Sequence, residues 1–191
     1  MTSTRTWNVR RGITPVETQG DLIGALLALR GVSPAMQEAF FAPTYGNSIH
    51  NPMGIFDMEK AVSRVMGAIK KKERIMVYGD YDADGICSTA IMVSTLTDIG
   101  AHVFPFLPHR YDDGYGLSSD ALSAMKSEFD VLITVDCGIS NAAEVALLRD
   151  AGKDTIIVDH HELPETLPAA YAILHPRHPK GSYAWGHLCG A

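Results

Sequence analysis

Residues 75–85 read Ile-Met-Val-Tyr-Gly-Asp-Tyr-Asp-Ala-Asp-Gly, an apolar run that leads directly into three carboxylates between two glycines. Such a short apolar run, bounded by glycine, predicts a strand buried on both faces at 75–78. The following stretch, 86–99, is long enough for a helix, and Gly100 supplies its end. A buried strand followed by a helix is half of a βαβ unit, which predicts an α/β fold built on a parallel sheet.

The same alternation of short apolar runs and amphipathic stretches continues toward the C-terminus. Pro105 indicates that one of these strands lies at an edge of the sheet or ends early. Ser118 or Ser119 and, further on, Ser140 precede stretches of helical length and are expected to cap them. We expect four further strands, at 102–107, 131–135, 156–158 and 172–174. The predicted fold class is α/β, with a doubly wound, mostly parallel sheet and helices on both faces.

Residues 1–72 lack this alternation and predict a small helical segment in front of the α/β domain. Short helices are expected at 21–29 and 34–41. Asp57 is expected to cap a longer helix that ends near the close of this segment. The chain is thus expected to divide into a helical segment, 1–72, and an α/β domain, 73–191.

The composition is that of a soluble globular protein, with 46% hydrophobic and 20% charged residues among 191. No apolar run approaches the ~18–20 residues needed to cross a bilayer. The first residues lack the apolar core of a signal peptide. Three cysteines without CxxC spacing predict neither a disulfide framework nor a structural zinc site. These observations predict a cytoplasmic protein with no membrane contact.

Acidic and imidazole side chains follow three of the predicted strands. In an open parallel sheet the carboxyl ends of the strands share one edge, where ligands bind. Seven side chains are therefore expected to converge there: Asp80, Asp82 and Asp84 after 75–78, Asp136 after 131–135, and Asp159, His160 and His161 after 156–158. One aspartate after a strand is commonly only a helix cap, whereas three such strand ends are rare by chance. Gly79 and Gly85 are expected to let the first of these loops turn tightly.

A divalent metal site is the simplest way to hold these groups together. Carboxylates at ~4 Å repel one another by a few kcal/mol per pair, and residues 80–165 carry 4 basic against 16 acidic side chains. Carboxylate and imidazole ligands favour Mn²⁺ or Mg²⁺ over zinc, and this many carboxylates indicates two ions with a shared ligand. Such cations would also let an acidic surface accept a polyanion. Ser88 opens the helix that follows, where a phosphate could bind.

Three further polar residues each have two interpretations. Arg110 lies in a glycine-containing loop, where its guanidinium could bind a phosphate with two hydrogen bonds or pair with Asp112 or Asp113. His175 and His178 have the HxxH spacing of some metal ligands. The prolines around them would break a helix that aligned the two rings, so both are expected to be plain loop residues.

Four motifs, in order along the chain, resemble those of the DHH phosphoesterase superfamily. They are Gly-Asp-Tyr-Asp-Ala-Asp-Gly at 79–85, His-Arg-Tyr-Asp-Asp-Gly-Tyr-Gly-Leu at 109–117, Asp-Cys-Gly-Ile-Ser at 136–140 and Asp-His-His at 159–161. Within the superfamily, the first two are similar to those of the bacterial single-strand-specific 5′→3′ DNA exonucleases. Residues 51–61 and 188–191 extend the resemblance over nearly the whole chain. Asp113 stands where the family commonly has glutamate.

The resemblance implies that five residues are metal ligands or their direct support: Asp80 and Asp82 for a first ion, Asp84 and His160 for a second, and Asp136 as the bridge between the two ions. It also implies that His161 faces the scissile phosphate and that Asp159 orients an imidazole, so that these two residues and Asp136 form the catalytic set. Arg110, Ser88 and His161 are expected to contact the substrate.

The function implied by the resemblance is Mn²⁺- or Mg²⁺-dependent hydrolysis of phosphodiester bonds in single-stranded DNA from the 5′ end, in recombination and repair. The implied partners are single-stranded DNA and, through further domains, single-strand-binding protein or other repair factors. The family's catalytic domain continues to another metal-binding aspartate, so this chain is expected to be an N-terminal fragment. Two alternatives stay open: a DHH phosphoesterase acting on oligoribonucleotides or small nucleotides, and a non-catalytic binding scaffold.

Overall fold

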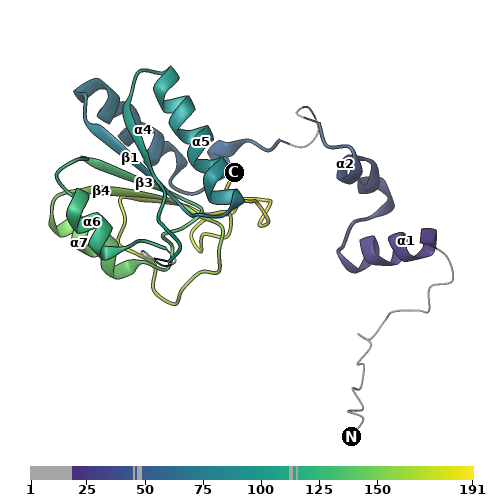
Figure 1. The fold of residues 1–191 in the computed structure, drawn as a ribbon. Helices are drawn as coiled ribbons and strands as arrows, with labels where there is room; N and C mark the ends of the chain where they lie inside the picture. The colour runs from purple at the N-terminus through teal and green to yellow at the C-terminus, as the bar shows by residue number, and fades with distance from the viewer. Residues whose placement is uncertain (1–18, 45, 47–48, 112–113, 115) are drawn as a thin grey trace, which may run out of the picture. The chain divides into compact units, whose positions relative to one another are not determined.

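The computed structural model describes residues 19–44, 46, 49–111, 114 and 116–191, which fall into two compact units, Met1–Asn51 and Pro52–Ala191 (Figure 1). In the first unit α1 spans Gln19–Leu29. A 3₁₀ turn, η1 (Pro34–Met36), then leads into α2 (Gln37–Phe41). Both helices expected in this region are therefore present.

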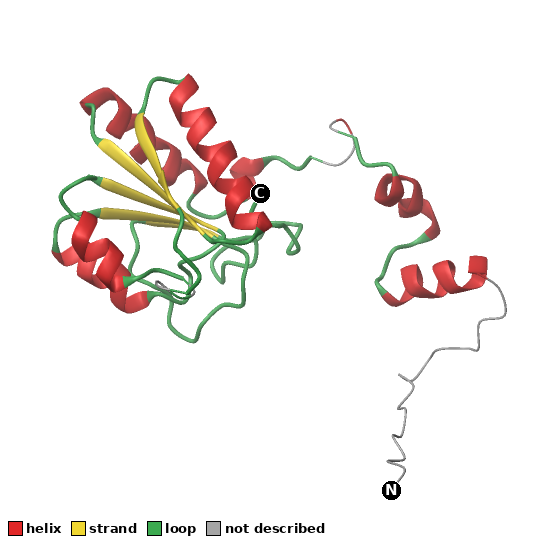
Figure 2. Ribbon diagram, in the orientation of Figure 1, coloured by secondary structure: helices red, strands yellow, loops and turns green. Residues whose placement is uncertain are grey.

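The second unit is built on a five-stranded sheet in which every neighbouring pair of strands is parallel (Figure 2). Its strands are β1 (Arg74–Gly79), β2 (His102–Phe106), β3 (Val131–Val135), β4 (Asp154–Val158) and β5 (Ala172–Leu174). The strand order is β2-β1-β3-β4-β5, which places Pro105 on an edge strand, where its missing N–H costs no ladder bond. The predicted parallel α/β fold is confirmed.

Helices cover both faces of this sheet, α4 and α5 on one and α6 and α7 on the other (Figure 1). They follow a short 3₁₀ turn, η2 (Pro52–Gly54), and span Met58–Lys71 (α4), Ala83–Asp98 (α5), Ser119–Met125 (α6) and Ala142–Asp150 (α7). Among the helices of the described residues, none has both the length and the apolar character needed to cross a membrane.

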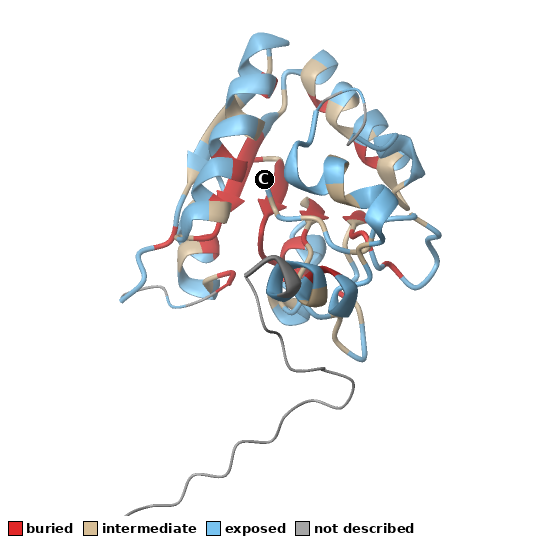
Figure 3. Ribbon diagram, turned by 90° about the vertical axis from the view of Figure 1, so that its right-hand side faces the viewer, coloured by how far each residue is buried: buried red, intermediate tan, exposed pale blue. Residues whose placement is uncertain are grey.

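Side-chain alternation along the strands gives the unit two cores. Ile75 and Val77 of β1 pack in one core with Ala68 of α4. Met76 and Tyr78 point to the other face of the sheet, where they pack in the core that includes residues of α6 and α7. Figure 3 shows the strands buried while the outer faces of the helices stay exposed. A strand buried on both faces must be apolar throughout, which is why the sequence pattern indicated the sheet so clearly.

Of the three expected helix caps, Ser118 is confirmed, Asp57 lies at the N-cap position of α4 without a side-chain cap hydrogen bond, and Ser140 is wrong. Ser118 caps α6 through the amide of Ala121, as expected. Ser140 does not cap a helix, because α7 begins only at Ala142. Asp57 precedes α4 with a positive φ of 63°, and its carboxylate accepts from the amide of Ile173 at 3.2 Å rather than from α4. That hydrogen bond ties the start of α4 to the edge strand β5.

Arg64 of α4 joins three segments at the amino edge of the sheet. Its Nη1 lies 2.6 Å from Oε2 of Glu73, and its Nε lies 2.6 Å from Oδ2 of Asp154. The Arg64 side chain is only 15% exposed. Loss of the guanidinium would remove the short ion pairs of two partly buried carboxylates and leave Glu73 only Lys71 at 3.8 Å, which is more costly than loss of an exposed ion pair.

We predict that Arg64→Met lowers the free energy of unfolding by about 1–3 kcal/mol. Arg149→Met is the matched control, because among the described residues the Arg149 guanidinium pairs only with the exposed Asp150; its effect should stay within about 0.5 kcal/mol. Urea unfolding of both variants measures this. Equal effects of the two substitutions would show that the Arg64 pairs do not stabilise the unit.

Candidate metal centre

The register of the sheet brings three aspartates to the same level of its carboxyl edge. Gly79 of β1 pairs with Val135 of β3, which in turn pairs with Val158 of β4. The next residue in each chain segment is Asp80, Asp136 or Asp159, and all three are buried. The predicted convergence of these strand ends is therefore what the structure shows.

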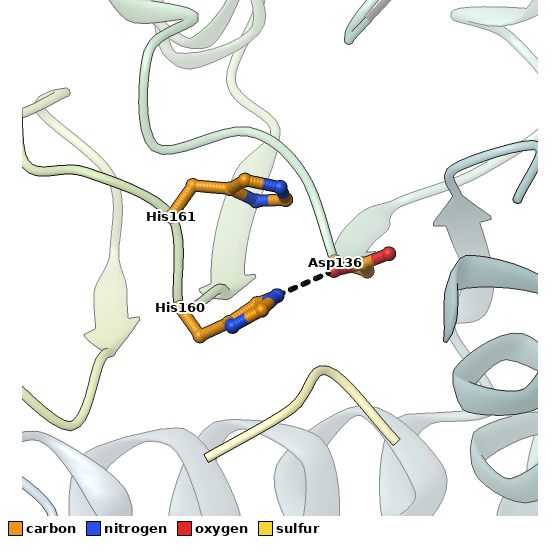
Figure 4. A group of neighbouring side chains, drawn as sticks. All are labelled: Asp136, His160 and His161. Atoms are coloured by element: carbon orange, nitrogen blue, oxygen red, sulfur yellow. Dashed lines mark hydrogen bonds and ion pairs between the residues drawn. The ribbon is translucent and has the colours of Figure 1, made fainter. Parts of the chain in front are cut away.

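Asp136 is the most constrained member of this group. It is 1% exposed and has a positive φ of 61°, a conformation that non-glycine residues rarely adopt. Its Oδ1 lies 3.0 Å from Nε2 of His160, and both imidazoles point toward it (Figure 4). Its Oδ2 is buried and has no hydrogen-bond partner among the residues that the structure describes. A strained backbone and a buried carboxylate oxygen without a hydrogen-bond donor are expected of a residue that binds a metal ion.

Electrostatics at Asp136 point to the same need for a cation. Burial raises the pKa of Asp136 to about 6, and the charges of Asp84 and Asp82 act in the same direction. Burial also raises the pKa of Asp80. The ionised forms of these groups are therefore disfavoured in the protein alone. A divalent cation would reverse this balance by compensating their charge.

Asp82 and Asp84 sit at the start of α5 and differ in their partners. Oδ1 of Asp82 accepts from the amides of Asp84 and Gly85 at 2.9 and 3.0 Å, so Asp82 is also the helix cap. A carboxylate offers about four acceptor positions, which leaves Asp82 with capacity for a metal. Oδ2 of Asp84 lies 3.6 Å from Nε2 of His160 and accepts from the amide of Gly190 at 2.8 Å.

Asp159 organises the turn that carries the two histidines. Its Oδ1 accepts from the amides of His160 and His161 at 2.7 and 3.1 Å, and Nδ1 of His161 lies 2.8 Å from the same oxygen. Burial lowers the pKa of His161, but the hydrogen bond to Asp159 and the nearby carboxylate charges outweigh it, so the pKa is raised. Through this contact Asp159 can orient the imidazole of His161, and the catalytic role of the two residues stays a prediction.

Two sets of side chains lie close enough to hold a metal ion, with ligand atoms within 4.8 Å of one another. One set is Asp80, Asp82 and Asp136, and the other is Asp136, His160 and His161. Asp136 belongs to both. Carboxylate oxygens and imidazole nitrogens without a thiolate suit Mn²⁺ or Mg²⁺. The donor set therefore fits the expected ions, and the shared carboxylate fits a two-ion arrangement.

The two expected substrate contacts outside this cluster have other partners in the structure. Ser88 is buried, and its hydroxyl donates to the carbonyl of Asp84 at 2.6 Å. The Arg110 guanidinium lies over the ring of Tyr81, 5.3 Å from its centre. Asp112 and Asp113 lie outside the described residues. The substrate roles of Ser88 and Arg110 stay predictions.

The glycines of the first motif serve a purpose that differs from the expected one. Neither has a positive φ; both allow close packing of α5 on the end of β1. A Cβ on Gly85 would lie 2.4 Å from the carbonyl oxygen of Asp80, and one on Gly79 would lie 2.0 Å from Oγ1 of Thr89. A side chain at either position would force α5 and the end of β1 apart.

Sequence reasoning missed two contributors to the site. The amides of Gly190 and Ala191 donate to the two carboxylate oxygens of Asp84, each at 2.8 Å. His175 lies in a loop, as expected, but it is buried and contacts the carbonyl of His161. Backbone donors and acceptors carry no sequence signal, so no pattern could have indicated these contacts.

Fold and site together define a class: α/β proteins with a carboxylate–imidazole metal site at the carboxyl edge of a parallel sheet. The model of the DHH family, N-terminal domain, matches residues 74–191. The chain therefore belongs to the DHH family.

Curated relatives of the chain include single-stranded-DNA-specific exonucleases. The chain is 38% identical over 170 residues to the single-stranded-DNA-specific exonuclease RecJ of Bacillus subtilis, covering 88% of this chain and 22% of that protein. It is 41% identical over 121 residues to RecJ of Escherichia coli, covering 62% of this chain and 21% of that protein. The chain thus spans about a fifth of the length of these relatives.

Solved structures give the same family. A crystal structure of exonuclease RecJ bound to manganese matches with a TM-score of 0.65 and 36% identity, covering 72% of this chain and 36% of that one. RecJ from Thermus thermophilus in complex with Mn²⁺ matches with a TM-score of 0.65 and 30% identity, covering 87% of this chain and 22% of that one.

We predict that Asp136→Asn stabilises the protein in EDTA at pH 7.5, by about 2–3 kcal/mol. The pKa of Asp136 is raised from 3.8 to about 6 on folding, so its stabilising contribution is present below pH 3.8 and is lost as the pH rises through about 6. The difference between variant and wild type should therefore vanish near pH 4.

Urea unfolding at the two pH values measures this, with Asp150→Asn as the exposed control that should change stability little at either pH. A destabilised Asp136→Asn variant at pH 7.5 would contradict the electrostatic account of the site.

Proposed function

We propose that this chain carries the metal-binding part of an exonuclease that hydrolyses single-stranded DNA from its 5′ end, using Mn²⁺ or Mg²⁺ as two bound ions. The observation that carries the proposal is Asp136, a buried and strained carboxylate shared by both candidate ligand sets, with one oxygen lacking a donor in the described part of the chain. Similarity to RecJ exonucleases supports the substrate class.

The proposed role of each side chain follows the resemblance to the DHH family. Asp84 belongs to neither ligand set and is included because its Oδ2 lies 3.6 Å from Nε2 of His160. The metal ligands and their direct support are Asp80 and Asp82 for one ion, Asp84 and His160 for the other, and Asp136 for both. When bound, such ions supply Lewis-acid polarisation of the phosphoryl oxygens. Asp159 holds the Nδ1 proton of His161, so the opposite nitrogen of that ring is the one assigned to the scissile phosphate. Arg110 and Ser88 complete the proposed substrate contacts.

The proposal includes the division of the chain and its setting. We assign residues 73–191 to the catalytic domain and 1–72 to a helical segment in front of it. The proposed partners are single-stranded DNA and, in a longer protein containing this chain, single-strand-binding protein or other repair factors. The proposed setting is DNA recombination and repair in the cytoplasm.

The binding-scaffold alternative predicts loss of the metal ligands, because nothing would maintain them. The carboxylates and imidazoles assigned as ligands are all present, and Asp136 lies in a strained conformation that costs about 1–3 kcal/mol. A scaffold would gain nothing from that strain. This observation favours a catalytic site.

We predict that, in the full-length protein, Asp136→Ala lowers the hydrolysis of a 5′-phosphorylated single strand in Mn²⁺ at least a hundredfold, because a shared ligand serves both ions. Asp150→Ala, which removes an exposed carboxylate of α7, should retain wild-type activity. Release of nucleotides from a labelled strand measures both variants.

Parallel reactions with duplex DNA and with an oligoribonucleotide define the substrate. Faster hydrolysis of the oligoribonucleotide than of single-stranded DNA would show that the protein is a DHH phosphoesterase of oligoribonucleotides or small nucleotides. Binding of the single strand by wild type without hydrolysis would support the scaffold and overturn the proposed function.

A further inference from the structure

The loop that leaves β5 lies against residues 159–161, which form the turn that carries the two histidines of the site and is called the histidine turn below. Strands β4 and β5 are parallel neighbours, and the amide of Asp159 donates to the carbonyl of Leu174 at 3.1 Å, just beyond their last paired residues. The two chain segments therefore leave the sheet side by side. His175 and Arg177 follow on one segment, and His160 and His161 on the other.

His175 is held in one tautomer by its neighbours. It is 1% exposed, and its Nδ1 lies 3.0 Å from the backbone amide of Arg177. A backbone amide can only donate, so Nδ1 must be the unprotonated nitrogen and Nε2 must carry the proton. Nε2 lies 2.8 Å from the carbonyl oxygen of His161. The ring thus donates one hydrogen bond to the histidine turn.

Arg177 adds two more donors to the same turn. Its Nη2 donates to the carbonyls of His160 and His161 at 3.1 and 3.2 Å. Its Nη1 also donates to Oε1 of the exposed Glu162 side chain at 3.1 Å. The carbonyls of both histidines are therefore held by side chains from the loop after β5.

Opposite sides of the histidine turn are thus fixed by different elements. Asp159 holds the two amides, and His175 with Arg177 holds the two carbonyls. The peptide unit between His160 and His161 is held at both its donor and its acceptor, which restricts the directions in which the two histidine side chains leave the backbone. Removal of hydrogen bonds that orient metal ligands commonly lowers metal affinity 10–100-fold.

We propose that His175, together with Arg177, is a positioning residue for the metal site: it sets the orientation of His160 and His161 through their backbone carbonyls. The proposal rests on the proposed function for its effect on metal binding. The orientation of the rings themselves is independent of that function.

His178 provides a matched control within the same loop. It too is buried, and its Nδ1 accepts from a backbone amide two residues ahead, that of Lys180, at 3.1 Å. Its ring stacks on Phe56 with the centroids 4.2 Å apart. These partners lie outside the histidine turn. A purely structural role of buried loop histidines would make His175 and His178 equivalent.

The test compares His175→Phe, which keeps most of the ring volume but removes the donor, with His178→Phe and with His175→Gln, which keeps an N–H donor. Ring ¹⁵N resonances of His160 and His161 are recorded in EDTA, and Mn²⁺ affinity is measured by titration calorimetry. We expect His175→Phe to shift both ring signals and to weaken Mn²⁺ binding at least tenfold. His178→Phe and His175→Gln should stay near wild type in both measurements.

If His175→Phe does not fold, Arg177→Met tests the positioning role instead. It should shift the same ring signals and weaken Mn²⁺ binding several-fold. Unchanged ring signals in the folded His175→Phe protein, or in Arg177→Met, would overturn the positioning role. Equal shifts in His178→Phe would do the same. Absence of Mn²⁺ binding by wild type would overturn the proposed function alone, and the ring signals in EDTA would still decide the positioning role.

Discussion

Parallel pairing of β1, β3 and β4 in a single register is the constraint on which the whole site depends. Because Gly79, Val135 and Val158 lie side by side, the residue after each strand is placed at the same edge. Three buried carboxylates at one edge repel one another, and the hydrophobic cores on both faces keep the strands from moving apart. The carboxyl edge of the sheet is therefore electrostatically unfavourable, and a bound cation would remove much of this repulsion.

This cost is visible in the conformation of the residues concerned. Asp136 has a positive φ, and its burial raises the pKa of its carboxyl group to about 6, so above that pH the ionised group opposes folding when no cation is bound. Stability is supplied elsewhere, by apolar strands buried on both faces and by the Arg64 ion pairs at the opposite edge. Separation of a stabilising core from a strained rim is the usual division in enzymes that hold charge in place before the substrate arrives.

Sequence patterns predicted the sheet and the meeting of its strand ends, because strands buried on both faces leave a continuous apolar signature. They did not predict local backbone geometry. The expected cap at Ser140 is wrong because the turn after Asp136 is shaped by other contacts: the amide of Ile139 donates to Asp159, and α7 starts only after Asn141. The prediction of His175 as a plain loop residue is incomplete, because its partner is the backbone carbonyl of His161, which the β4–β5 pairing brings beside it and no sequence spacing indicates.

The shared role of Asp136 is tested most directly by anomalous diffraction from crystals of the protein soaked in MnCl₂. We expect two manganese peaks, both in contact with the Asp136 carboxylate, one beside Asp80 and Asp82 and the other beside His160. Manganese bound elsewhere, with the Asp136 carboxylate in contact with no ion, would contradict it.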